Sequence, residues 1–281
     1  MIRRVDRINT VPGDIPEAEL RPPPWPQWTF GIALQGSSGM VLEAHAEHWG
    51  EPALGPISIA QNPDPEVLAR QLQQDLLDCL KPGDLLCIPT GRSPRDLYRF
   101  IREDVDSAER WRSFRYLQLD EYLDPSGRIP SFRDELRQQI FEPLQIPAEN
   151  ICSIDPMAEP EKQAKNLDEV YQQWGPPKAC VLGLGGNGHI AFNEPGSNFS
   201  GYTVVDLAPE TVATNFQDSA PTGLQALTIS LDQILAAPNI FLLVPQPEKS
   251  KLLDQCLAGP RTSEIPASCL HDHPGLHVYR H

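Results

Sequence analysis

The sequence predicts an α/β protein with an open, mostly parallel sheet and helices on both faces. From residue 57 onward, short apolar runs alternate with longer amphipathic segments, and this alternation is typical of strand–helix–strand units. The run at 84–88 is almost continuously apolar, as expected of a parallel strand that is covered on both faces. With 40% hydrophobic and 22% charged residues, the chain has the composition of a globular protein with a sizeable core.

Residues 1–56 are expected to form an N-terminal extension. Prolines crowd the segment 11–27, and because proline lacks an amide donor this segment is predicted to run as an extended arm. Residues 28–35 alternate large apolar with smaller or polar side chains, which indicates a strand, and the Gly-Ser-Ser-Gly sequence at 36–39 suits a hairpin loop. The chain is therefore divided into this Pro-rich arm with its β-hairpin and a main α/β domain at 57–281.

The first half of the main domain is predicted to contain three strands and three helices. Leucines recur at every fourth position from 68 to 80, which places them on one stripe of a helix that Pro82-Gly83 ends. Ser131 suits the cap of the third helix. The expected elements are a strand at 57–60, a helix at 63–80, a strand at 84–88, a helix from Pro94, a strand at 115–119 and a helix at 131–144.

The second half continues the same alternation without internal repeats. The expected elements are a polar helix at 158–174, a strand at 179–184, a strand or turn near 202–206, strands at 226–230 and 240–244, a helix at 247–257 and a last strand at 277–280. Together these elements predict a Rossmann-like sheet.

Charge and cysteine usage exclude several classes of partner. The formal net charge of −15 disfavours nucleic acid, and it requires any phosphate site to supply its own local positive field. The six cysteines show no Cys-x-x-Cys spacing and several lie in apolar runs, as buried free thiols do. The basic N-terminus is not followed by an apolar segment, and no stretch approaches the length of a membrane span. We expect a soluble, reduced, cytoplasmic protein with no membrane or nucleic-acid partner.

Polar loops follow three of the predicted strands. They are PTGRS at 89–93, LDEY at 119–122 and GGNGH at 185–189. Because the carboxyl ends of parallel strands meet at one edge of a sheet, and ligands bind there, these loops are expected to converge on one site.

The loop PTGRS has the composition of an anion site. Gly91 permits a close approach, Thr90 and Ser93 offer hydroxyls, and the next helix presents free amide groups. The guanidinium of Arg92 can bind a phosphate through two hydrogen bonds. Lys249, at the start of a later helix, is a candidate second ligand. The alternatives are an ordinary strand-to-helix turn and a solvated lysine.

The other two loops offer acid–base groups. Asp120 and Glu121 could provide a carboxylate base held at a strand end, or they could be solvated surface carboxylates. His189 and Glu194 follow a glycine-rich turn after the strand at 179–184, and an imidazole beside a carboxylate suits proton transfer. The alternative is a glycine turn with a surface histidine and glutamate.

Taken together, these motifs resemble the glucosamine-6-phosphate deaminases, also called isomerases, which share a superfamily with 6-phosphogluconolactonases. The match runs in order from about residue 57 to the C-terminus and rests on PTGRSP (89–94), LDEY (119–122), IPAENI (146–151), GLGGNGHIAFNEPGS (183–197) and PASCLHDHP (266–274). Lactonases typically have Asp-Glu-Arg and a GHTASLFP-like string at the second and fourth of these places, whereas here Tyr122 follows Asp-Glu and Glu194-Pro195-Gly196 closes the glycine-rich motif. The resemblance therefore favours the deaminase branch.

The resemblance implies conversion of glucosamine 6-phosphate and water to fructose 6-phosphate and ammonia, with no cofactor and no catalytic metal. His189 would move the proton of ring opening, Glu194 and Asn187 would assist it, and Asp120 would take a proton from C2 and return it at C1. The substrate would be bound by Thr90, Gly91, Arg92, Ser93, Glu121, Gly186 and Lys249. Because the family includes monomers and hexamers, a homo-oligomer stays open, as do allosteric control and the role of residues 1–56.

Two departures from the family pattern stand out. Asn187 occupies a position where some members carry Asp, which removes one charge beside His189. The segment 211–217, TVATNFQ, lacks the arginine that the family usually contributes to the phosphate there. Our hypothesis is that Arg92 supplies this guanidinium from the opposite loop. The departure leaves room for another sugar phosphate, such as a galactosamine analogue.

Two alternative functions follow from the same residues. One is a 6-phosphogluconolactonase or another sugar-phosphate isomerase of the same fold. The other is a non-catalytic sugar-phosphate sensor, but such regulators need a DNA-binding module, and residues 1–56 show no helix-turn-helix pattern. The combination of Asp120, His189 and Glu194 favours an enzyme.

Overall fold

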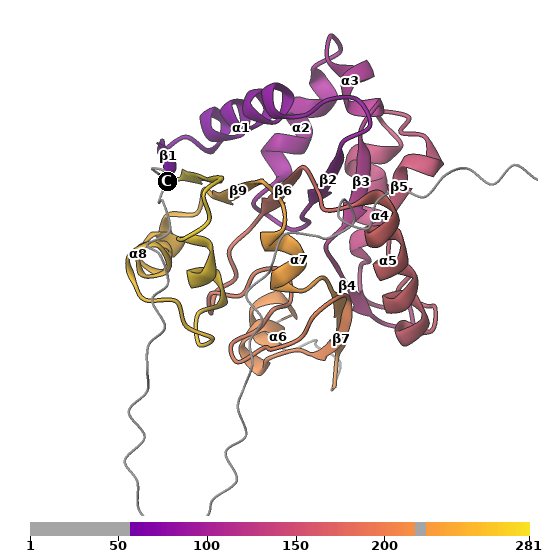
Figure 1. Ribbon diagram of the computed structural model, residues 1–281, viewed down its shortest axis with the longest axis vertical. Coiled ribbons are helices and arrows are strands. Elements are labelled where there is room, and N and C mark those ends of the chain that lie inside the picture. The colour runs from indigo at the N-terminus through magenta and orange to yellow at the C-terminus, as the bar shows by residue number, and fades with distance from the viewer. Residues whose placement is uncertain (1–56, 217–222) are drawn as a thin grey trace, which may run out of the picture. The chain divides into compact units, whose positions relative to one another are not determined.

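The structure is a computed structural model that describes residues 57–216 and 223–281 (Figure 1). The expected Pro-rich arm and hairpin at 1–56 lie outside these residues. Across the two described ranges, no helix is long and apolar enough to cross a membrane.

Seven parallel strands form the main sheet, which confirms the predicted fold class. The strand order is β1-β10-β9-β6-β2-β3-β5, and every neighbouring pair is parallel. The strands are β1 (Ser58–Gln61), β2 (Leu85–Ile88), β3 (Arg115–Gln118), β5 (Ile151–Cys152), β6 (Ala179–Leu182), β9 (Asn239–Val244) and β10 (Leu276–Arg280).

A second, antiparallel sheet has the strand order β4-β8-β7. Its strands are β4 (Asp120–Leu123), β7 (Thr203–Asp206) and β8 (Gln225–Thr228). The expectation that Asp120 directly follows the end of a main-sheet strand at 115–119 is wrong in detail. The chain instead leaves the main sheet after Gln118, whose side-chain amide donates to the carbonyl of Asp120 at 2.8 Å, and Asp120 begins a strand of the second sheet.

Helices cover both faces of the main sheet (Figure 1). On one face lie α1 (Pro65–Cys79), α2 (Arg95–Glu103), α3 (Ala108–Arg112) and α4 (Phe132–Leu136), the last continuing as the π-helix η2 (Arg137–Phe141). On the other lie α5 (Pro160–Trp174), α7 (Leu231–Leu235) and α8 (Ser250–Ala258). The remaining elements are α6 (Pro209–Phe216) and the 3₁₀ helices η3 (Ala148–Asn150), η5 (Pro247–Lys249) and η6 (Pro266–Leu270).

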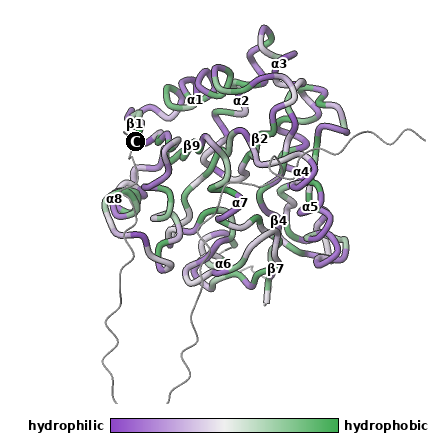
Figure 2. The backbone as a smooth tube through the Cα atoms, viewed as in Figure 1, coloured by the Kyte–Doolittle hydropathy of each residue, from purple (hydrophilic) through white to green (hydrophobic). Residues whose placement is uncertain are grey.

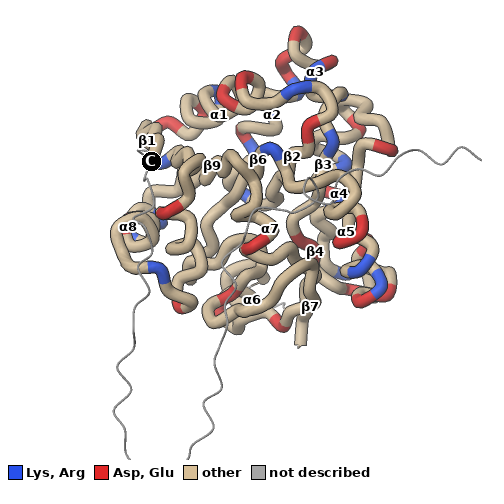
Figure 3. Tube along the Cα trace, viewed as in Figure 1, with Lys and Arg blue, Asp and Glu red and all other residues tan. Residues whose placement is uncertain are grey.

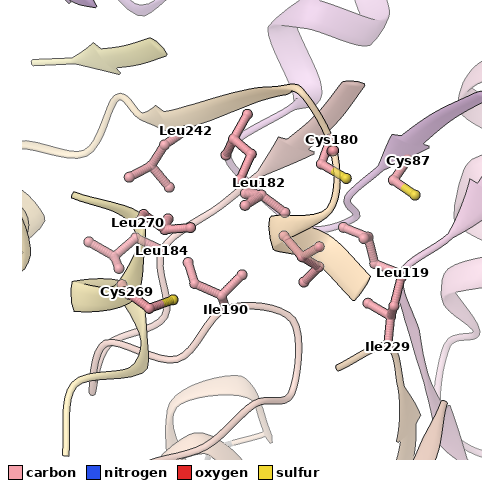
Figure 4. Packing of buried hydrophobic residues seen from close by; sticks show 14 of the residues in the cluster. Cys87, Leu119, Cys180, Leu182, Leu184, Ile190, Ile229, Leu242, Cys269 and Leu270 are labelled. Carbon is pink, nitrogen blue, oxygen red and sulfur yellow. The ribbon is translucent and has the colours of Figure 1, made fainter. Parts of the chain in front are cut away.

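Alternation along the strands divides the core between these two faces. On β2, Leu86 and Ile88 pack towards α1 and α2, whereas Leu85 and Cys87 pack towards α5, α7 and α8. Figure 4 shows the second cluster, in which Leu182 of β6 and neighbouring side chains meet. Green and purple alternate along α1 and α5 in Figure 2, as expected for helices with one buried and one exposed side.

All six cysteines lie within the described residues, and the reduced state stays a prediction. All six are free, and four of them are buried. Cys87 and Cys180 face each other in register on β2 and β6 in the core. Because both thiols are buried among apolar side chains, they act as small core residues.

Helix boundaries were predicted less well than strands. The helix expected at 131–144 begins as predicted, because the hydroxyl of Ser131 accepts from the amide of Asp134 at 3.3 Å. It then widens into η2 and ends at Phe141. The short helices α3, α6 and α7 were not predicted at all.

Candidate active site

A cavity of about 580 Å³ opens at the carboxyl ends of β2, β3 and β6. Since these strands are neighbours in the parallel sheet, the three polar loops meet there, as expected. The cavity is lined by nine of the predicted site residues, namely Thr90, Gly91, Arg92, Ser93, Asp120, Gly186, Asn187, His189 and Lys249.

Glu121 lies outside the cavity lining and is fully buried. Its carboxylate accepts hydrogen bonds from the amides of Phe132 at 2.9 Å and Arg133 at 2.7 Å and from the hydroxyl of Ser131 at 2.8 Å. These donors are the free amides and cap of α4. Glu121 therefore holds the start of α4 against β4, and the structure does not bring it to the cavity as a substrate ligand.

His189, Asn187 and Glu194 form a hydrogen-bonded relay. Nδ1 of His189 lies 2.8 Å from Oδ1 of Asn187, whose Nδ2 donates to Oε2 of Glu194 at 2.7 Å. Nδ1 also lies 3.4 Å from the same Glu194 oxygen. Glu194 is buried behind the other two and acts on the cavity through them.

The relay fixes the tautomer of His189. Burial alone would raise the pKa of Glu194, but hydrogen bonds from His189, Thr211 and Asn187 outweigh it and lower the pKa, so the carboxylate is ionised. An ionised carboxylate only accepts, so the Asn187 amide must donate to it and turn its oxygen towards the imidazole. Nδ1 of neutral His189 then carries the proton. Nε2 is left without a hydrogen-bond partner among the described residues.

The glycines of this turn make room for the imidazole. A Cβ added at Gly185 would lie 2.3 Å from the His189 ring, and one added at Gly188 would lie 2.8 Å from Ile265. Gly188 also has a φ of +86°, which side chains rarely adopt. Glycine is therefore required at positions 185 and 188 for this turn to place His189 at the cavity.

Asp120 faces the cavity from the start of β4 and is 9% exposed. Burial, reinforced by the neighbouring charge of Glu121, raises the pKa of Asp120 to about 8. No hydrogen bond to its carboxylate is found among the residues the structure describes. Asp120 thus has the features of a proton carrier near neutral pH.

The loop at 89–93 and Lys249 form a positively charged end of the cavity. Gly91 has a φ of +87°, and the loop runs into the N-terminus of α2. The ammonium group of Lys249 donates to the carbonyl of Leu184, and burial together with nearby Arg92 lowers the pKa of Lys249. The guanidinium of Arg92 is exposed and forms no ion pair within the described ranges. Acidic residues are spread over many other elements, among them β4, α3 and α5 (Figure 3).

Aromatic side chains form an apolar wall of the cavity. The ring of Tyr122 lies 4.6 Å from that of Phe132, 5.1 Å from that of Phe192 and 5.0 Å from that of Phe216, centroid to centroid. Asn215 also donates to the hydroxyl of Tyr122 at 2.9 Å. Such a wall can pack against the carbon skeleton of a sugar while polar groups meet its hydroxyls.

Sequence reasoning missed several cavity residues. Gln246 donates to the hydroxyl of Ser93 at 2.9 Å, and its place just after β9 was a signal that the strand-end argument could have used. Thr211, whose hydroxyl lies 3.4 Å from Nδ1 of His189, belongs to α6, which was not predicted. Glu135 falls within the helix expected at 131–144 and was not expected at the site, yet it lines the cavity and accepts from the Gly91 amide.

The described part of the chain contains no group of three or more His, Cys, Asp or Glu residues arranged to hold a metal ion. The expected absence of a cofactor stays a prediction.

Sequence comparisons find glucosamine-6-phosphate deaminases among the relatives of this chain. A glucosamine-6-phosphate deaminase from Lachnoclostridium phytofermentans is 32% identical over 211 residues, which make up 71% of this chain and 87% of that protein. One from Streptococcus thermophilus is 36% identical over 198 residues, or 68% of this chain and 82% of that protein.

Solved structures give the same fold. A monomeric glucosamine-6-phosphate deaminase superposes with a TM-score of 0.73 and 27% identity, covering 80% of this chain and 97% of that one. A 6-phosphogluconolactonase from Thermotoga maritima superposes with a TM-score of 0.63, covering 79% and 98%, but at 18% identity it shows the fold alone. The family model of glucosamine-6-phosphate isomerases and 6-phosphogluconolactonases matches residues 63–278, and the chain belongs to this family.

Proposed function

We propose that this protein is a glucosamine-6-phosphate deaminase, which converts glucosamine 6-phosphate and water to fructose 6-phosphate and ammonia. The observation that carries the proposal is the placement in one cavity of Asp120, the cationic loop at 89–93 and His189, whose Nε2 has no hydrogen-bond partner among the described residues. The relatives at 32% and 36% identity carry this name, which supports the same assignment.

His189 would open the pyranose ring. Nε2, which the relay leaves unprotonated, takes the proton of the C1 hydroxyl and delivers it to the ring oxygen, so that the C1–O5 bond breaks and an aldehyde forms. The transfer leaves the protonation state of His189 unchanged. Such a transfer contributes roughly 10²–10⁴ in rate.

Asp120 would then move a proton between the two carbons. Its carboxylate takes the C2 proton while a proton of the substrate ammonium passes to the aldehyde oxygen, which gives an enolamine with a hydroxyl on C1. Asp120 then returns the C2 proton at C1, which gives an iminium at C2. Water adds to this carbon and ammonia leaves, so the ketone fructose 6-phosphate is formed. The substrate ammonium beside Asp120 favours the ionised carboxylate that the first step needs, offsetting the raised pKa.

The loop at 89–93 with Lys249 would bind the phosphate. Arg92 and Lys249 supply two positive charges, and the amides at the start of α2 add hydrogen bonds and a favourable dipole. Binding energy gained at this remote group positions C1 and C2 against the two proton carriers. Arg92 supplies the guanidinium that the family's arginine, absent here from 211–217, would otherwise provide to the phosphate.

We assign the protein to the cytoplasm, in keeping with its six free cysteines.

The test is a coupled assay that follows fructose 6-phosphate and ammonia from glucosamine 6-phosphate. The lactonase alternative predicts acid release from 6-phosphogluconolactone and no ammonia from the amino sugar. A sensor would bind the sugar phosphate without turnover. Ammonia release that is lost in Asp120→Asn supports the proposal, and a wild-type protein that releases none contradicts it.

A further inference from the structure

Three of the groups expected to bind phosphate have hydrogen-bond partners inside the protein. The amide of Gly91 donates to Oε1 of Glu135 at 3.2 Å. The hydroxyl of Ser93 accepts from Gln246, and Lys249 donates to a backbone carbonyl. These three groups are thus hydrogen-bonded within the protein, as polar groups at a partly buried site require.

Glu135 differs from the other partners because it is an anion. It reaches the loop from α4, 44 positions away along the chain, and its side chain lines the cavity beside Arg92 and Lys249. The Gly91 amide belongs to the loop that leads into α2, and a carboxylate oxygen on this amide competes with a phosphate oxygen for the same hydrogen bond. The single N–H of Gly91 cannot donate fully to both.

The loop does not depend on Glu135 for its shape. Gly91 holds its left-handed conformation with no heavy atom within 4 Å of the place a Cβ would take. On the other side, the hydroxyl of Tyr98 donates to the carbonyl of Pro89 and anchors the loop to α2. The contact between Tyr98 and Pro89 does not involve Glu135, so the Glu135 carboxylate can be displaced while the loop stays anchored to α2.

We propose that Glu135 is an internal competitor of the substrate phosphate and sets how tightly the cavity binds phosphorylated sugars. A phosphate that enters the loop must displace this carboxylate from the Gly91 amide, and the displaced charge still repels the phosphate dianion. This inference rests on the proposed function for the identity of the substrate. The effect of Glu135 on anion binding at the loop 89–93 can be measured with inorganic phosphate alone.

The experiment compares wild type with Glu135→Gln and Glu135→Ala by calorimetric titration with inorganic phosphate. Both variants remove the charge, and the alanine variant also frees the amide, so each should lower the phosphate Kd by about fivefold or more. The KM for glucosamine 6-phosphate should fall with it, while kcat changes less. The thermal midpoint of each variant shows whether that variant is folded. If Glu135→Gln is unfolded, the phosphate Kd of Glu135→Ala alone decides the test.

Asp134→Asn is the matched control. Asp134 precedes Glu135 on α4, lies outside the cavity lining and pairs with Arg137 at 3.4 Å, so the same charge is removed without touching the loop. Its phosphate Kd should stay within about twofold of wild type. If Asp134→Asn lowers the phosphate Kd as much as Glu135→Gln does, the effect is a general one of net charge, and the proposal is overturned.

The outcomes separate this inference from the proposed function. Unchanged or weaker phosphate binding in both Glu135 variants overturns the inference, even if the wild type deaminates glucosamine 6-phosphate. If the Glu135 variants bind phosphate more tightly but the wild type does not deaminate glucosamine 6-phosphate, the competitor role is supported and the proposed function is contradicted.

Discussion

Oδ1 of Asn187 lies 2.8 Å from Nδ1 of His189, and this contact decides which ring nitrogen is free to act in the cavity. The amide is oriented by Glu194, which accepts its N–H at 2.7 Å. A neutral amide therefore does what a carboxylate does in other acid–base relays, but without adding a charge beside the imidazole.

Replacing Asn187 with alanine should reduce kcat. Without the amide oxygen the imidazole loses its fixed tautomer and orientation, so we expect kcat to fall by about 10²-fold, within the range attributed to proton transfer, with little change in KM. Steady-state kinetics on glucosamine 6-phosphate test this. A higher KM with an unchanged kcat would show that Asn187 binds substrate instead of positioning His189.

Gly185→Ala should displace the imidazole. The new Cβ would lie 2.3 Å from the His189 ring, which must then move. We expect kcat to fall by about 10-fold or more while the thermal midpoint shifts little. Gly186→Ala provides the comparison, because its Cβ would meet nothing within 4 Å, and its effect should fall on KM. Equal losses of kcat in both variants would contradict this geometry.

Arg92→Ala should raise KM for the phosphorylated sugar by about 10-fold, since a charged hydrogen-bonding partner of the phosphate is removed. Arg95→Ala is the control, because Arg95 is an exposed arginine at the start of α2, just after the loop, and does not line the cavity. An unchanged KM in Arg92→Ala would refute the idea that Arg92 replaces the arginine missing from 211–217.

Asp120 should make the stability of the protein fall with rising pH. Its pKa is about 8 when folded and about 4 in an unfolded chain, so the folded state binds its proton more tightly between these values. Stability from this group is therefore lost as the pH rises from about 4 to 8. Urea denaturation of wild type and Asp120→Asn at pH 5 and pH 8 should show the variant gaining about 2 kcal/mol or more relative to wild type at the higher pH. A difference that does not vary with pH would contradict the raised pKa.

The sequence was sufficient for the main sheet and for three site loops. Parallel strands with apolar runs are recognisable locally, and the rule that ligands bind at their carboxyl ends brought the loops of Thr90, Asp120 and His189 together. The relay around His189 was also expected, because its residues are close in sequence.

The predictions that failed concern residues whose positions depend on pairing between strands, or on packing between elements, far apart in the sequence. Asp120 and Glu121 were both expected at the site, but they belong to β4, and neighbours on a strand point to opposite sides. The strand itself could not be recognised, because its partner β8 lies about a hundred residues away. Likewise α6, which brings Thr211 to His189, has no strong helical pattern of its own.

The most direct test of the account is the turnover of glucosamine 6-phosphate by wild type and Asp120→Asn, with calorimetric phosphate binding as a control for an intact site. The account predicts fructose 6-phosphate and ammonia in equal amounts from the wild type. It also predicts a kcat reduced by at least about 10²-fold in the variant, with phosphate binding retained. A variant that turns over at the wild-type rate would contradict the assignment of Asp120 as the carbon base.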